Sequence, residues 1–122
     1  MKVILVDAVD TFVLEGEGIY KPMHEMLEMY SNRKIILTNA NDEQMVKFGL
    51  TDMPYEVFTL KHNPDKPDPI YFKTMLDHFG LKADEVVYFE HNPVHFRIWT
   101  ARNLKNWCRK DFCFCRRAFG RK

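Results

Sequence analysis

The stretch VILVDAVDT, residues 3–11, decides the fold expected of this chain. It opens with four apolar residues, mostly β-branched, and the run stops at Asp7, which is the pattern of a short buried strand. Residues 35–37 and 86–89 form two further apolar runs of the same kind. Because these runs are apolar throughout rather than alternating, they favour strands of a parallel sheet that is covered on both faces.

Helical patterns alternate with the strand patterns along the chain. We expect strands at residues 2–7, 33–38, 55–60 and 86–90, and helices at residues 19–30, 42–48 and 69–79. The segment between the first strand and the first helix, residues 8–17, is expected to be an irregular link. This order predicts an α/β fold, a Rossmann-like three-layer sandwich with a parallel sheet.

Local signals sharpen the two longer helices. Pro22 falls in the first turn of one helix, where a missing N–H costs little. Asp68 and Pro69 begin the other, and Gly80 ends it. We expect the apolar residues at helical spacing to face the core, namely Ile19, Met23, Met26, Leu27, Met29 and Tyr30 in the first helix and Ile70, Phe72, Met75, Leu76 and Phe79 in the last.

The length and composition indicate one domain without a membrane span. A chain of 122 residues can bury a modest core. It contains no apolar run near the roughly 20 residues that cross a bilayer. The N-terminus lacks a basic region and a small-residue cleavage site, so we expect no secretory signal. With three cysteines, all within the last 15 residues, we expect a reducing, cytoplasmic location.

The charge divides the chain into an acidic part, residues 1–94, and a basic part, residues 95–122. The basic part holds nine of the 18 Lys and Arg residues but one of the 17 acidic residues, together with both tryptophans. Three interpretations stay open: a helix with a basic end, a segment that binds nucleic acid or another acidic surface, and the product of a shifted reading frame. A shifted frame would remove an edge strand, so the sheet would lack its last strand.

Polar residues of the kinds that can attack or bind a phosphoryl group lie at the ends of the predicted strands. Asp7, Thr38 and Glu90 each end an apolar run, and in a parallel sheet ligands bind at the carboxyl ends of strands. Asn39 follows Thr38, and Lys66 precedes the last predicted helix in the run Lys-Pro-Asp-Pro. A carboxylate can attack phosphorus, while a lysine and a hard cation offset the charge on the phosphoryl oxygens.

These four motifs, in this order, resemble the haloacid dehalogenase (HAD) superfamily, which consists largely of phosphatases and phosphotransferases. The resemblance covers residues 1–94. It implies that Asp7 is the nucleophile and forms an aspartyl-phosphate, that Thr38, Asn39 and Lys66 bind the substrate phosphate, and that Asp7 and Glu90 hold Mg²⁺. The expected activity is hydrolysis of a small phosphorylated molecule.

Two positions, Val9 and His91, depart from the pattern of the family. Val9 stands where phosphatases of this family usually carry the aspartate that protonates the leaving group, and such help is typically worth about 10²–10⁴ in rate. We therefore expect slow turnover. Asp10 could substitute only if the chain left extended geometry there, because neighbouring side chains of a strand point to opposite faces. His91 follows Glu90 where a second acid is common, and imidazole suits transition metals better than Mg²⁺.

Other functional interpretations remain. The Asp-Ala-x-x-Thr start also resembles the dehalogenase branch, which attacks carbon without Mg²⁺, but the roughly 30 residues between Asp7 and Thr38 leave no room for that branch's helical lid. The chain could also be an impaired relative that binds phosphate or a partner without turnover. A nucleic-acid-associated protein that uses residues 95–122 is a third possibility. We assign no role to His24, His62 or His78.

Overall fold

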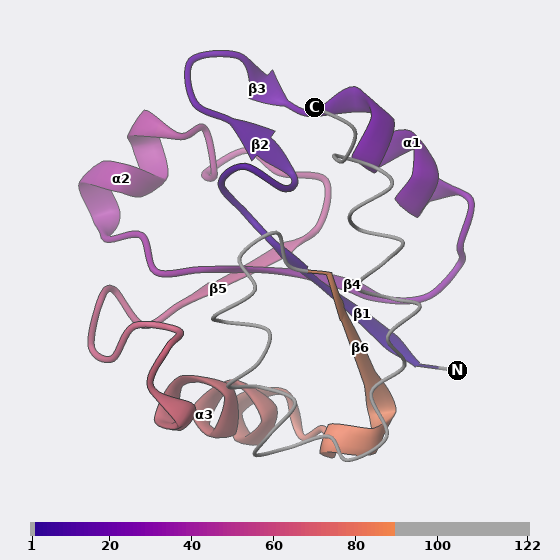
Figure 1. The fold of residues 1–122 in the computed structure, drawn as a ribbon, viewed down its shortest axis with the longest axis vertical. Helices are drawn as coiled ribbons and strands as arrows, with labels where there is room; N and C mark the ends of the chain where they lie inside the picture. The colour runs from indigo at the N-terminus through magenta and orange to yellow at the C-terminus, as the bar shows by residue number, and fades with distance from the viewer. Residues whose placement is uncertain (1, 90–122) are drawn as a thin grey trace.

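The computed structural model describes residues 2–89 of the chain, and a four-stranded parallel sheet forms its centre (Figure 1). The strands lie in the order β5 (Glu56–Thr59), β4 (Lys34–Thr38), β1 (Val3–Asp7) and β6 (Val86–Phe89). All neighbouring pairs are parallel. The four predicted strands are thus confirmed, and their bounds differ from the predicted ones by no more than one residue.

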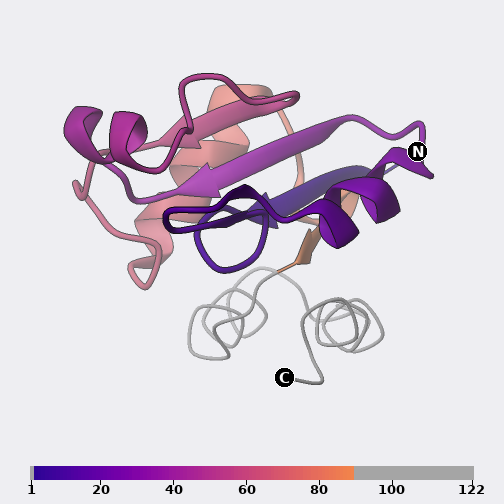
Figure 2. The same ribbon diagram turned by 90° about the horizontal axis from the view of Figure 1, so that it is seen from above.

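Helices cover both faces of the sheet (Figure 2). One face carries α1 (Lys21–Glu28) and α2 (Asp42–Lys47), and the other carries α3 (Pro69–Phe79) followed by a 3-10 helix (Ala83–Glu85). Chain order explains this division. The connections β1–β4 and β4–β5 step toward one edge of the sheet, whereas β5–β6 steps back past β1, and right-handed crossovers in opposite directions lie on opposite faces. The expectation of a mixed α/β fold with a parallel sheet between helices is therefore confirmed.

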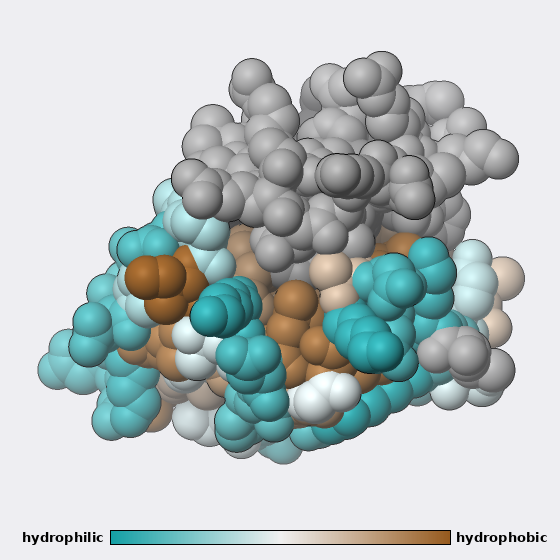
Figure 3. Space-filling view, turned by 90° about the horizontal axis from the view of Figure 1, so that it is seen from below, coloured by the Kyte–Doolittle hydropathy of each residue, from teal (hydrophilic) through white to brown (hydrophobic). Residues whose placement is uncertain are grey.

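Two apolar clusters fill the spaces between the sheet and its helices. Alternate residues of β1 divide between them: Leu5 belongs to the α3 side and Val6 to the α1 side, and both are fully buried. The α3 side combines aliphatic side chains with the buried aromatic rings of Phe58, Tyr71, Phe72 and Tyr88. On the surface of that side, hydrophilic residues surround the apolar residues that remain exposed (Figure 3). The sheet is buried on both faces, as its apolar strands predict.

Caps define the start of α2 and both ends of α3, and those of α3 are the predicted ones. Asn41 closes a capping box at the start of α2: its Oδ1 accepts from the Gln44 N–H at 2.9 Å, and the Gln44 side chain accepts from the Asn41 N–H at 3.0 Å. At α3, the Asp68 carboxylate accepts from the Ile70 N–H at 2.9 Å. Gly80 ends that helix in the left-handed region, with φ at 66°.

Parts of the sequence prediction are wrong. Residues 8–17 are not an irregular link throughout, because they include β2 (Val13–Leu14), which forms a hairpin with β3 (Gly18–Ile19). Ile19 therefore lies in a strand and not in the helix predicted over residues 19–30, which begins at Lys21. Met29 and Tyr30 are exposed rather than in the core, since α1 ends at Glu28 and the chain turns away. Ile70 is exposed as well, and Tyr71 takes the buried place in the first turn of α3.

The predictions for Glu90, His91 and the basic segment 95–122 lie outside the described residues. Within residues 2–89, no helix is both long enough and apolar enough to span a membrane.

The buried hydroxyl of Tyr71 ties α3 to two strands, and its loss should destabilise the protein. The hydroxyl donates to the carbonyl oxygens of Thr38 at 2.7 Å and Phe58 at 3.1 Å. Tyr71→Phe leaves these oxygens without that donor, and we expect it to lower the free energy of unfolding by about 1–3 kcal/mol. Urea denaturation measures the change. Tyr30→Phe, at an exposed tyrosine, is the matched control; equal effects of the two changes would contradict the prediction.

Candidate functional site

A buried ion pair lies at the carboxyl end of the central strand β1. Asp7 is the last residue of β1, and the Lys66 Nζ group donates to its Oδ1 from the loop that precedes α3. The side chains are only 6% and 4% exposed, so the two charges are almost fully withdrawn from water. Such a pair needs good geometry and further hydrogen bonds to offset the desolvation of both ions.

The further hydrogen bonds come from the segment after β1. The Thr11 hydroxyl, fully buried, donates to Asp7 Oδ2 at 3.1 Å. The backbone is coiled tightly around one acceptor there, because the N–H groups of Phe12 and Val13 both donate to the Ala8 carbonyl, at 2.8 and 2.9 Å. Each carboxylate oxygen of Asp7 therefore has a donor, and both donors fix the orientation of the group.

Thr38 and Asn39 border the same site from the neighbouring strand. Thr38 ends β4, and its Oγ1 accepts from the Ala40 N–H at 3.1 Å, which leaves the hydroxyl proton available to a ligand. Asn39 Oδ1 accepts from the Lys66 N–H at 2.8 Å and so holds the lysine loop against the end of β4. Four of the five predicted site residues are thus brought together; the fifth, Glu90, is not among the described residues.

These residues line a pocket of about 250 Å³ at the carboxyl edge of the sheet. The edge is also where the strand order reverses: the chain runs outward from β1 through β4 to β5 and then returns to place β6 on the other side of β1. Such a switch point is the usual place for a ligand in an open α/β sheet. The lining consists of Asp7, Val9, Asp10, Thr38, Asn39, Ala40, Gln44, Phe48, His62 and Lys66.

Asp10 lies on this pocket, contrary to what an extended segment would give. Its φ is 64°, in the left-handed region, and its N–H donates to the Val13 carbonyl at 2.8 Å. The turn brings Asp10 to the same pocket as Asp7, whereas alternation along a strand would put the two residues, three apart, on opposite faces. The chain therefore leaves extended geometry at Asp10, which is the condition under which Asp10 could substitute for the acid missing at Val9.

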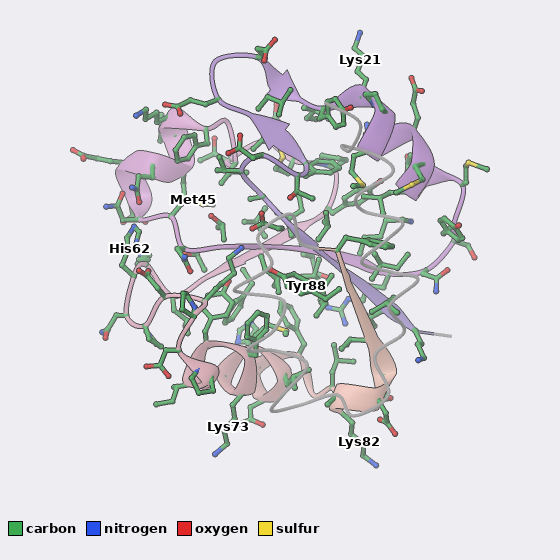
Figure 4. The ribbon with its side chains drawn as sticks, in the orientation of Figure 1. Lys21, Met45, His62, Lys73, Lys82 and Tyr88 are labelled. Carbon is green, nitrogen blue, oxygen red and sulfur yellow. The ribbon has the colours of Figure 1, made fainter. Side chains whose placement is uncertain are left out.

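Four lining residues were not predicted from the sequence, namely Ala40, Gln44, Phe48 and His62. The His62 ring joins two elements, since its Nδ1 lies 2.7 Å from Asp65 Oδ1 and its Nε2 lies 2.6 Å from Gln44 Oε1. Figure 4 shows His62 on the loop that follows β5, close to α2. The place of these four residues in the chain could have indicated them, because Ala40, α2 and this loop all follow strands whose carboxyl ends border the site.

The donor chemistry of the pocket suits a hard cation in part. Asp7 and Asp10 are two carboxylates on one pocket, and Mg²⁺ is commonly held by one or two carboxylates together with water and substrate oxygens. Among residues 2–89 no group of three or more His, Cys, Asp or Glu side chains is arranged to hold a metal.

Comparisons with known proteins identify no relative. No family model matches the chain, no curated protein matches it, and no solved structure matches it.

The buried Asp7–Lys66 pair leads to a stability prediction. Lys66→Met leaves the Asp7 carboxylate buried without its cation, and we expect a loss of about 3–5 kcal/mol in the free energy of unfolding. The double change Asp7→Asn with Lys66→Met removes both charges and should cost less than Lys66→Met alone. Urea denaturation of Asp7→Asn, Lys66→Met and the double variant, each compared with the wild-type protein, measures this coupling.

A lysine in the same loop provides the control. Lys61 pairs with Asp42 at 3.1 Å, but both side chains are more than half exposed. Lys61→Met should therefore cost less than about 1 kcal/mol. Additive effects of Asp7→Asn and Lys66→Met would contradict the coupling.

Proposed function

We propose that this protein is a HAD-type phosphomonoesterase in which Asp7 is the nucleophile. The observation that carries the proposal is the buried Asp7–Lys66 pair at the carboxyl end of β1, beside Thr38 and Asn39. It places a carboxylate, a cation, a hydroxyl and an amide on one pocket of a parallel sheet, which is the set that phosphoryl transfer through an acyl phosphate requires. The order of these residues along the chain supports the same family.

Each residue has a defined task in this proposal. Asp7 attacks phosphorus, the bond to the leaving oxygen breaks, and water then hydrolyses the aspartyl-phosphate. Lys66 exchanges its contact with Asp7 for a phosphoryl oxygen, so the positive charge that orients the nucleophile also offsets the charge that builds up on phosphorus. The Thr38 hydroxyl and the Asn39 amide donate to further phosphoryl oxygens.

We propose that Asp7 holds Mg²⁺ together with Glu90, and Asp10 adds a carboxylate on the same pocket. When bound, the ion would supply further positive charge beside the phosphoryl oxygens. Thr11 keeps Asp7 in its orientation in either case, since its hydroxyl contacts Oδ2.

The apolar side chain of Val9 argues for slow turnover and favours one alternative. Val9 lines the pocket at the position where the family usually has its proton donor. Without that donor, poor leaving groups depart slowly. The alternative is a protein that binds phosphate at this site without hydrolysing esters, and the first experiment below separates the two.

The first prediction concerns the nucleophile. We expect the full chain to hydrolyse an activated aryl phosphate such as p-nitrophenyl phosphate when Mg²⁺ is present, because this leaving group needs little protonation. Asp7→Asn should reduce the rate at least 100-fold, since a neutral amide does not attack phosphorus. Release of p-nitrophenolate, followed by absorbance, measures both rates.

The controls for this assay are chelation and a distant carboxylate. EDTA should abolish the activity of the wild-type protein, and Asp52→Asn, in the loop after α2, should retain it. Folded wild-type protein that releases no more product than Asp7→Asn would favour phosphate binding without hydrolysis.

The second prediction concerns Val9. Val9→Asp places a carboxyl group on the pocket wall, and we expect it to raise hydrolysis of an alkyl phosphate by at least about tenfold, because proton donation is typically worth 10² or more when well placed. Hydrolysis of p-nitrophenyl phosphate should change far less. Val9→Asn, of the same size, is the control; a gain with asparagine equal to that with aspartate would exclude proton transfer as the cause.

A further inference from the structure

We infer that the pocket selects aryl phosphate monoesters, with the ring of the leaving group seated against an apolar wall formed by Val9, Ala40 and Phe48. This inference rests on the proposed function and extends it to a substrate class. All three residues line the pocket that holds Asp7 and Lys66. They come from three different segments: the turn after β1, the turn after β4, and the end of α2.

The apolar wall is continuous with the core. Ala40 belongs to the buried cluster on the α1 side of the sheet, and Val9 and Phe48 pack against that cluster while staying partly exposed. The wall is therefore backed by packed side chains and keeps its shape without a ligand. A preformed apolar surface beside a few polar groups is the usual composition of a small-molecule pocket.

Two polar residues at the rim, His62 and Gln44, already contact other parts of the protein. Both ring nitrogens of His62 have partners, Asp65 at 2.7 Å and Gln44 at 2.6 Å. Gln44 Oε1 also accepts from the Asn41 N–H in the capping box. These contacts occupy both ring nitrogens of His62 and the side-chain oxygen of Gln44, so His62 presents a flat ring face rather than a free ring nitrogen to a ligand.

The size of the pocket fits a single ring. Ligand pockets commonly measure about 300–1,000 Å³, and about 250 Å³ lies just below that range. A phosphate group with one six-membered ring is a ligand of suitable size. A nucleotide, with base, sugar and phosphate, would extend well outside.

The reaction chemistry points to the same class. Asp7 attacks phosphorus, the bond between phosphorus and the aryl oxygen breaks, and the phenolate leaves with the electron pair. A phenol has a pKa near 10, as in tyrosine, so phenolate departs without a proton donor and takes its proton from water afterwards. Water then attacks the aspartyl-phosphate, which gives inorganic phosphate and the free Asp7 carboxylate. Val9 cannot donate a proton to the leaving group, and an aryl ester does not need one.

Binding of two phosphonates tests the inference independently of turnover. Phenylphosphonate and methylphosphonate carry the same charged group, and each has a P–C bond in place of the P–O bond that hydrolysis of an ester breaks. We expect the full chain with Mg²⁺ to bind phenylphosphonate at least about tenfold more tightly, because ring burial against an apolar surface is worth that much or more. Isothermal titration calorimetry measures both dissociation constants.

Variants of α2 assign the preference to the wall. Phe48→Ala should reduce phenylphosphonate affinity about tenfold and leave methylphosphonate affinity within about twofold. Phe48→Leu keeps most of the buried volume, so it serves if the alanine variant does not fold, and it should lose part of the preference. Val46→Ala removes an exposed apolar side chain from the same helix and should change neither affinity.

The outcomes separate this inference from the proposed function. Equal binding of the two phosphonates, binding of neither, or equal weakening of both by Phe48→Ala and Phe48→Leu, would overturn the aryl subsite even if Asp7-dependent hydrolysis is observed. A clear preference that depends on Phe48, in a protein without Asp7-dependent hydrolysis, would support the subsite and overturn the enzymatic function. A preference with hydrolysis supports both.

Discussion

The arrangement of this protein depends on one buried carboxylate. Asp7 stands at the end of the central strand with a side chain only 6% exposed, and an ion so placed requires compensation. Lys66 crosses from the loop before α3 to supply the opposite charge, and Thr11 folds back from the next turn to supply a hydroxyl. The paths of both segments are therefore tied to a single functional group, and the pocket is the space that these segments enclose.

The same constraint explains why the site is built where it is. The carboxyl end of β1 is the switch point of the sheet, because the crossover from β1 to β4 and the crossover from β5 to β6 lie on opposite faces. Segments that follow β1, β4 and β5 converge there and none needs to be long. Asn39, which accepts from the Lys66 N–H, shows how such convergence is fixed: the end of one strand holds the loop that follows another.

Much of the fold could be predicted from the sequence, because its determinants are local. Apolar runs fix the strands, and Asn41, Asp68 and Gly80 fix the helix ends. The pocket residues Asp7, Thr38 and Asn39 were predictable because strand ends in a parallel sheet meet at one edge. Lys66 lies in a loop, and only the resemblance to a family predicted that it joins them. The hairpin of β2 and β3 was not predictable, since its strands have two residues each and are too short to show an alternating pattern. His62 was missed because its partners Asp65 and Gln44 are joined only in the folded chain.

Val9 shows how one position changes meaning between sequence and structure. Compared with a family pattern, it is a missing acid. In the folded protein it is one of three apolar residues that line the pocket and pack on the same core cluster. An acid at this position would interrupt the apolar surface that Ala40 and Phe48 form with it, whereas valine completes that surface. Under the proposed function, the absence of a proton donor and the presence of an apolar wall are thus two consequences of one side chain, and both favour an ester whose leaving group is flat, apolar and stable as an anion.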